Sequence, residues 1–222
     1  MSRCDRYALL TALALAASAS LTQAGNRIGN GGNAVVCQDA KGKVRSAELL
    51  DFYEAELPSA ASTKAAPKTA QDEKAIARDR LAGLQKVHPD LARQFQTRLA
   101  EISSELQFGE GVALQPIDDS KHLFTPRDPK CAVRQLAIRR SEPMPREKRF
   151  LVDQDTWKLL SPTARAGLLT HEIVYEYFSK LGETDSRKAR YFNARLYNGA
   201  IAKMSAPEYW EMLQKLKLAM YP

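Results

Sequence analysis

The chain has 222 residues, of which 44% are hydrophobic and 27% charged, and its formal net charge is +7. This length is enough for one domain with a sizeable core, and no separate disulfide-rich domain is needed. The positive charge favours anionic partners. The basic residues are spread along the chain without a basic block or an aromatic platform, which excludes nucleic acid as the expected partner.

Residues 1–24 have the pattern of a secretory signal peptide. Arg3 and Arg6 precede an apolar run at 8–19, and small residues lead to a cleavage position at the end of this range. The small residues at 17–19 offer a second cleavage position. The apolar run is too short to span a bilayer, and no later segment reaches the length of a membrane span. We therefore expect an exported protein, periplasmic or secreted, with no integral membrane segment after signal cleavage.

The cysteines predict one disulfide. Cys4 leaves with the signal peptide, so Cys37 and Cys131 are the pair that remains. In an oxidising compartment such a pair is most simply explained by a bridge, and two free buried thiols are the alternative. A bridge would place the strand expected near Cys37 beside or near the strand that begins at Cys131.

After the signal peptide, residues 25–222 are expected to form a single domain. Glycine and asparagine mark the loops, apolar spacing marks the strands and helices, and small residues broken by prolines mark a linker. In chain order we expect a loop within 25–43 that contains a strand at 34–37, a helix within 44–57, a flexible linker at 58–71 and a helical hairpin at 72–107.

The second half of the domain mixes strands with a helical last third. Strands are expected at 112–117, 131–139 and 149–153. Helix starts are signalled by capping residues or first-turn prolines near Ser161, Ser186 and Ser205. Together these elements predict an α+β fold with a small, mainly antiparallel sheet packed against a C-terminal helical bundle.

The helix expected at 162–181 contains the sequence LLTHEIVYEYF. Its apolar residues cover so much of the helix surface that little is left for solvent, so we expect this helix at the centre of the fold. Its polar residues lie in the sequence HEIVYE, which begins at His171. This is one substitution away from the HExxH motif of zinc hydrolases, because Tyr175 stands where the second histidine would be.

The HExxH motif has a defined chemistry. Its two histidines bind zinc, and its glutamate takes a proton from metal-bound water. The same roles would make His171 a metal ligand and Glu172 the catalytic base, with His122 or Asp185 as a further ligand. Tyrosine is a poor zinc ligand at neutral pH, because a phenol with an ordinary pKa of about 10 has to lose a proton.

The alternative interpretation is a buried polar network. Glu172 and Glu176 lie one turn apart, and a polar stripe on the next helix contains Arg190, which we expect to reach one of these two carboxylates. This network either satisfies its own hydrogen bonds or lines a pocket. The expected polar cluster consists of His171, Glu172, Tyr175, Glu176, Ser186, Arg190 and Asn193.

Three stretches carry a resemblance to a known group: GNGGNAVVC, CAVRQLAIR, and residues 151–196, which include HExxYE and DSxxxR. They resemble exported bacterial proteins of undefined activity, over most of the chain after the signal peptide except 58–107. This resemblance implies a fold and a compartment but no reaction. The order of RFLVD, a short helix and the HE helix is also distantly similar to the edge strand and active helix of zincin metallopeptidases.

Two classes of function follow from these patterns. The first is a non-catalytic exported protein that binds an anionic envelope component or a partner protein and needs no cofactor. The second is a divergent zinc hydrolase acting on peptide or peptidoglycan, with His171 as a zinc ligand and Glu172 as the base. The buried polar network favours the first class.

Overall fold

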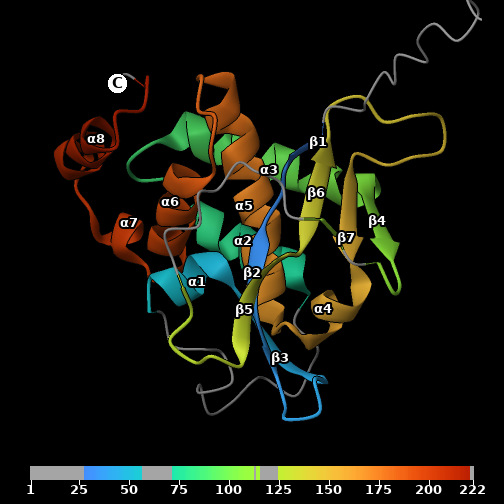
Figure 1. Cartoon of the computed structure of the whole chain (residues 1–222). Helices are drawn as coiled ribbons and strands as arrows, with labels where there is room; N and C mark the ends of the chain where they lie inside the picture. Colours follow the sequence, from blue (N-terminus) through green and yellow to red (C-terminus); the bar gives the residue numbers. More distant parts are fainter. Residues whose placement is uncertain (1–27, 57–71, 113, 116–124, 221–222) are drawn as a thin grey trace, which may run out of the picture.

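A computed structural model describes residues 28–56, 72–112, 114–115 and 125–220 (Figure 1). Within these ranges the chain forms eight α-helices, one short 3₁₀ helix and seven strands, and the fold is α+β. The signal peptide expected at 1–24, the linker expected at 58–71 and His122 lie outside the described residues.

The strands form two small sheets, where the sequence predicts one. The first sheet has the order β1 (Ile28–Asn30), β6 (Ala137–Arg140), β7 (Phe150–Asp153) and β4 (Leu106–Gly109). The second has the order β3 (Val44–Leu49), β2 (Asn33–Gln38) and β5 (Cys131–Gln135). All neighbouring strands pair antiparallel except β4 and β7, which are parallel. Both sheets are therefore small and mainly antiparallel, as expected.

Two segments of the chain pass from one sheet to the other at the same place. Gly31 and Gly32 separate β1 from β2, and Leu136 separates β5 from β6. The Gly32 carbonyl accepts hydrogen bonds from the amides of Leu136 and Ala137, both at 3.0 Å. The strand predicted at 131–139 is thus two strands, because the bend at Leu136 moves the chain from one sheet to the other.

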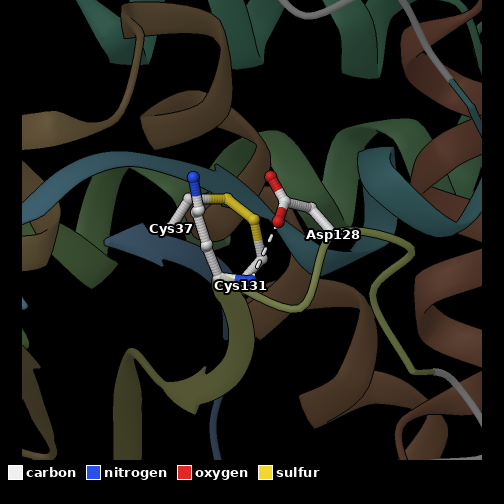
Figure 2. The surroundings of a disulfide bond; sticks show 4 residues. Cys37, Asp128 and Cys131 are labelled. Carbon is white, nitrogen blue, oxygen red and sulfur yellow. Dashed lines mark hydrogen bonds between the residues drawn. A yellow bond between two sulfur atoms is a disulfide. The ribbon is translucent and has the colours of Figure 1, made fainter. Parts of the chain in front are cut away.

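The predicted disulfide is present and joins neighbouring strands. Cys37 on β2 and Cys131 on β5 lie directly opposite each other in the antiparallel pairing. Figure 2 shows the bridge beside the Asp128 carboxylate, in the turn that leads into β5. In this turn the Lys130 amide donates a hydrogen bond to Asp128 Oδ1 at 2.8 Å, and the Cys131 amide donates to the Asp128 carbonyl at 2.9 Å. The predicted neighbourhood of the two cysteine-bearing strands is confirmed.

Helix α5 (Pro162–Lys180) lies at the centre of the fold, as its apolar surface predicts (Figure 1). It begins after Ser161, whose hydroxyl accepts a hydrogen bond from the Ala164 amide at 3.1 Å. Its helical neighbours are α2 (Glu73–Ala82), α3 (Pro89–Ile102) and α6 (Arg187–Tyr197). The remaining helices are α1 (Leu50–Glu54), α4 (Gln154–Leu159), α7 (Ala200–Lys203) and α8 (Ala206–Lys215).

Three further expected elements differ from the observed ones. Val44–Leu49, predicted as helix, is strand β3, and only the short helix α1 follows it. The end of the segment predicted as helix at 90–107 contains the 3₁₀ helix Ser103–Glu105 and the start of β4. Residues 112, 114 and 115 of the strand predicted at 112–117 are not in a strand, and the rest of it is not described. Strand β3 pairs with β2 in a hairpin, and β4 pairs with β7, which is distant in sequence; in both cases strand pairing overrides the local helical pattern.

In the part of the chain that the structure describes, no helix combines the length and the apolar character needed to cross a membrane.

Candidate functional site

His171 is at the centre of a buried hydrogen-bonded group formed by three helices. Its side chain on α5 is 0% exposed, and its Nδ1 lies 2.9 Å from Oδ2 of Asp51 on α1. Asn193 on α6 donates from Nδ2 to the same Asp51 oxygen at 2.7 Å and to the Gly167 carbonyl at 3.0 Å. One carboxylate therefore holds α1, α5 and α6 together.

The electrostatics of this group favour an ion pair between His171 and Asp51. Burial in itself lowers the pKa of His171, but the charge of Asp51 and their hydrogen bond outweigh burial and raise this pKa above its ordinary value. Burial in itself raises the pKa of Asp51, yet His171 and the Asn193 hydrogen bond outweigh burial and lower it. Both shifts stabilise the ionised forms.

Glu172 faces the place where the chain changes sheets. Its Oε1 accepts a hydrogen bond from the Gly32 amide at 2.6 Å, and its side chain is buried. Burial raises the pKa of Glu172, and the nearby His171 and the Gly32 amide only partly offset it. The carboxyl group thus connects the central helix to the two-glycine bend.

The glycines at this bend allow a close approach of backbone to helix. A Cβ on Gly32 would lie 2.2 Å from Cδ1 of Leu168, and a Cβ on Gly31 would lie 2.3 Å from the Ala137 carbonyl oxygen. At Gly31 the obstacle is backbone, so a side chain does not fit there; at Gly32 a side chain would require the buried end of Leu168 to move.

Glu176 is part of a different group. Its Oε2 accepts a hydrogen bond from Nε of Arg98 on α3 at 2.9 Å, and its Oε1 lies 3.3 Å from both Arg149 and Lys180. Burial acts to raise the pKa of Glu176, but the Arg98 hydrogen bond and these cations outweigh it and lower the pKa. Glu176 therefore ties α5 to α3.

Arg190 does not reach Glu172 or Glu176, the partners expected from the sequence. Its Nε donates to Oε2 of Glu54 at 2.8 Å, and its Nη1 donates to the Ser186 hydroxyl at 2.7 Å. The reason is the short helix α1, whose Glu54 contacts Arg190 directly. Glu172 is instead bound by the Gly32 amide, and Glu176 by Arg98 on α3.

Tyr175 takes no part in the hydrogen bonds around His171. Its ring centroid lies 6.2 Å from that of His171, its hydroxyl donates to the Thr184 carbonyl at 3.4 Å, and the Arg139 guanidinium lies 5.2 Å from its centroid. The seven side chains of the expected cluster are thus divided among several groups. The structure brings His171 and Asn193 together through Asp51, and Arg190 together with Ser186.

Asp185, one of the two proposed further zinc ligands, is engaged by Arg187 at 2.6 Å. The other, His122, is not described. Over the described ranges, no three His, Cys, Asp or Glu side chains gather in a way that could hold a metal ion.

Asp51 is the residue that sequence reasoning missed. It lies between Leu50 and Phe52, and all three side chains are buried. An acidic residue flanked by apolar residues was the available signal, because a buried carboxylate requires a partner inside the core. Nothing in the local sequence indicates that this partner is a histidine 120 positions away.

A cavity of about 480 Å³ opens next to the buried group, between α1 and α6. Asp51 forms part of its wall, so the cavity directly adjoins the buried group. Its main lining residues are Asp51, Glu54, Arg187, Arg190, Tyr191 and Arg195.

Comparisons of the chain with protein-family models, with curated proteins and with solved structures give no match. The function is therefore argued from the geometry of these residues.

Proposed function

We propose that this chain is a non-catalytic exported protein that binds an anionic component of the envelope or the acidic surface of a partner protein. The observation that carries the proposal is the burial of the HExxYE motif. His171, Glu172 and Glu176 are 0%, 2% and 5% exposed, and each is held by a side chain or amide of another element. These three side chains connect the central helix to α1, to the bend at Gly32 and to α3.

Burial of this kind fits poorly with zinc hydrolysis. A catalytic zinc needs several protein ligands, an open position for water and a base that reaches the substrate. His171 has its Nδ1 on Asp51, and the residue one turn further on is Tyr175.

One observation keeps a zinc hydrolase acting on peptide or peptidoglycan as the second candidate. His171 Nε2 and Glu172 Oε2 are buried and have no hydrogen-bond partner among the described residues. These are the two atoms that would contact a metal ion and its bound water.

The preference for anions rests on charge. The chain carries a net charge of +7, and the cavity beside the buried group contains three arginines on one helix. A positive surface raises the local concentration of anionic partners and makes their binding sensitive to salt.

Metal analysis of untagged protein, with His171→Ala and Glu172→Gln variants, separates the two candidates. We expect no stoichiometric zinc in the parent, a folded Glu172→Gln variant and a severely destabilised His171→Ala variant. One zinc per chain that is lost in His171→Ala and kept in Glu172→Gln would establish the hydrolase instead.

Binding is tested with the same protein by co-sedimentation with peptidoglycan sacculi and with anionic vesicles, with neutral vesicles as the control. We expect binding to an anionic material that weakens as salt is raised from about 50 to 300 mM. Over this range the Debye length falls below about 10 Å, so attraction between exposed charges is screened. Equal binding to neutral vesicles, or none to any anionic material, contradicts envelope binding.

A further inference from the structure

The cavity between α1 and α6 has the size of a small-molecule site. Its volume of about 480 Å³ lies within the range of roughly 300–1,000 Å³ that is typical of ligand pockets. Arg187, Arg190, Tyr191 and Arg195 share one face of α6, since their positions repeat at helical spacing. The end of α1 forms the facing wall.

The charges around this cavity are only partly compensated. Arg190 is paired with Glu54 at 2.8 Å, and Asp51 with His171 at 2.9 Å. Arg187 is likewise paired, with an aspartate just before α6 at 2.6 Å. Each of these charges already has an opposite charge within contact distance.

Arg195 differs from the other two arginines. Its Nε is buried and has no hydrogen-bond partner in the described part of the chain. Its guanidinium lies over the ring of Tyr191, 5.2 Å from the centroid. A buried donor without an acceptor is costly, and a guanidinium is best satisfied by a planar or tetrahedral oxyanion that accepts two hydrogen bonds.

Tyr191 adds an apolar surface beside this cation. It is 44% exposed, one of the few large hydrophobic side chains with such exposure among the described residues. Ala194, which lies between Arg190 and Arg195 in the sequence of α6, continues the apolar wall of the cavity. A ligand with an anionic group and a flat or apolar body would contact both.

We infer that this cavity binds a carboxylate or phosphate group carried on an apolar body, with Arg195 as the anion-binding residue and Tyr191 as the surface for the body. The inference rests on the proposed binding function and names its site. The site can be tested independently of the function, because envelope binding can also occur elsewhere on a positively charged surface.

The groove between α3 and α5 is less suitable. It has a similar volume, about 430 Å³, but its cations Arg98 and Lys180 both contact Glu176. An anion there would compete with a carboxylate that is already in place.

The test uses calorimetric titration of the full protein with phenyl phosphate, benzoate, inorganic phosphate and the neutral benzyl alcohol. We expect phenyl phosphate or benzoate to bind more tightly than inorganic phosphate, and benzyl alcohol not to bind. The tighter of the two aryl anions identifies the anionic group that the site prefers. Equal weak binding of all four probes contradicts the inference.

Variants locate the site. Arg195→Gln is expected to weaken binding of the aryl anion at least about tenfold, as loss of a charge-assisted hydrogen bond does. Tyr191→Ala is expected to weaken the aryl anion but not inorganic phosphate. The matched control is Arg134→Gln, which removes the same charge from an exposed position on β5 and is expected to leave affinity unchanged. Circular dichroism verifies that all three variants are folded.

The outcomes distinguish the inference from the proposed function. Equal losses in Arg195→Gln and Arg134→Gln mean non-specific attraction, which overturns the site. Binding to sacculi or anionic vesicles without any binding of aryl anions overturns the site and leaves the function. Binding of aryl anions through Arg195 without any envelope binding supports the site and overturns the envelope-binding function.

Discussion

At the scale of single residues, the contact between His171 and Asp51 joins the central helix α5 to α1. Both side chains are fully buried, and the Asp51 oxygen that contacts His171 also accepts from Asn193. Removal of one member of a buried ion pair leaves the other charge without a partner in a medium of low polarity. This is much more costly than loss of a pair at the surface.

Asp51→Asn is therefore expected to lower the free energy of unfolding by about 3–5 kcal/mol, which urea denaturation followed by circular dichroism measures. The control is Asp185→Asn, which breaks the more exposed pair with Arg187 and is expected to have a far smaller effect. Similar losses in the two variants would mean that the buried pair has no special role.

The same pair predicts a pH window. The raised pKa of His171 gives stability that is complete below about pH 6.5 and is lost as the pH rises through the raised value. The lowered pKa of Asp51 gives stability that is complete above about pH 4 and is lost as the pH falls through the lowered value. The cost of Asp51→Asn is thus expected to be largest between about pH 4 and 6.5.

The contribution of Glu172 to stability depends on pH in the opposite sense to that of Asp51. Because burial raises its pKa, the folded state binds the proton more tightly than the unfolded state, and this contribution is lost as the pH rises through the raised value. Gln at this position keeps an oxygen for the Gly32 amide and does not ionise. Glu172→Gln is expected to be more stable than the parent at pH 8, with a difference that vanishes near pH 4.

Denaturation curves at pH 4, 6 and 8 measure this difference. If the parent is instead the more stable protein and its advantage increases with pH, then Glu172 is ionised and stabilising, and burial does not control its pKa.

Sequence reasoning at this scale identified buried positions better than contacts. The distribution of apolar residues predicted that α5 lies at the centre of the fold, and its His171 and Glu172 are indeed buried. Their partners could not be predicted, since Asp51 is 120 positions from His171 and Glu172 is bound by a backbone amide, which has no side-chain signature. Arg190 was expected at Glu172 or Glu176 because the two helices follow each other in sequence, whereas nothing in the sequence indicated that Glu54 lies beside Arg190.

At the scale of elements, the bend at Gly31 and Gly32 couples the two sheets to the central helix. Gly32 donates its amide to Glu172 and its carbonyl accepts from the chain that leaves β5. Both interactions depend on the backbone lying against Leu168, where a Cβ would be only 2.2 Å from Cδ1. The bend is therefore a packing requirement as well as a change of direction.

Gly32→Ala is expected to destabilise the protein by about 1–3 kcal/mol, because the added methyl group forces the bend away from α5. Leu168→Ala removes the atom that the new methyl group meets. The two substitutions are thus expected to be less than additive in urea denaturation, and full additivity would show that the clash is not the cause.

The elements that local patterns identified best are those stabilised by local interactions. Helices α5 and α8 begin at Ser161 and Ser205, as their capping residues predict. Strand β3 forms a hairpin with β2 and was missed because Leu49 at its end continues the helical spacing of α1. Strand β4 was missed because it is defined by its parallel pairing with β7, which is distant in sequence. Pairing of this kind leaves no pattern within the strand itself.

At the scale of the whole molecule, the disulfide joins the N-terminal strands to the middle of the chain. Cys37 and Cys131 are 94 positions apart, and the chain between them contains α1, α2, α3 and β4. Without the bridge, β2 and β5 depend on their own hydrogen bonds and on the packing of β2 against β3 and α1. These are the strands that lead into the two-glycine bend and thus position the amide that Glu172 accepts from.

Replacement of both cysteines by serine is therefore expected to lower the free energy of unfolding by about 2–4 kcal/mol, because the unfolded chain gains the freedom of a long open loop. Chemical denaturation with and without reductant measures the effect. Reductant is expected to destabilise the parent by a similar amount and to leave the double variant unchanged, which separates loss of the bridge from loss of packing by the sulfur atoms. A double variant as stable as the oxidised parent would mean that strand pairing and the core alone hold β2 against β5, since closure of the loop would then contribute nothing.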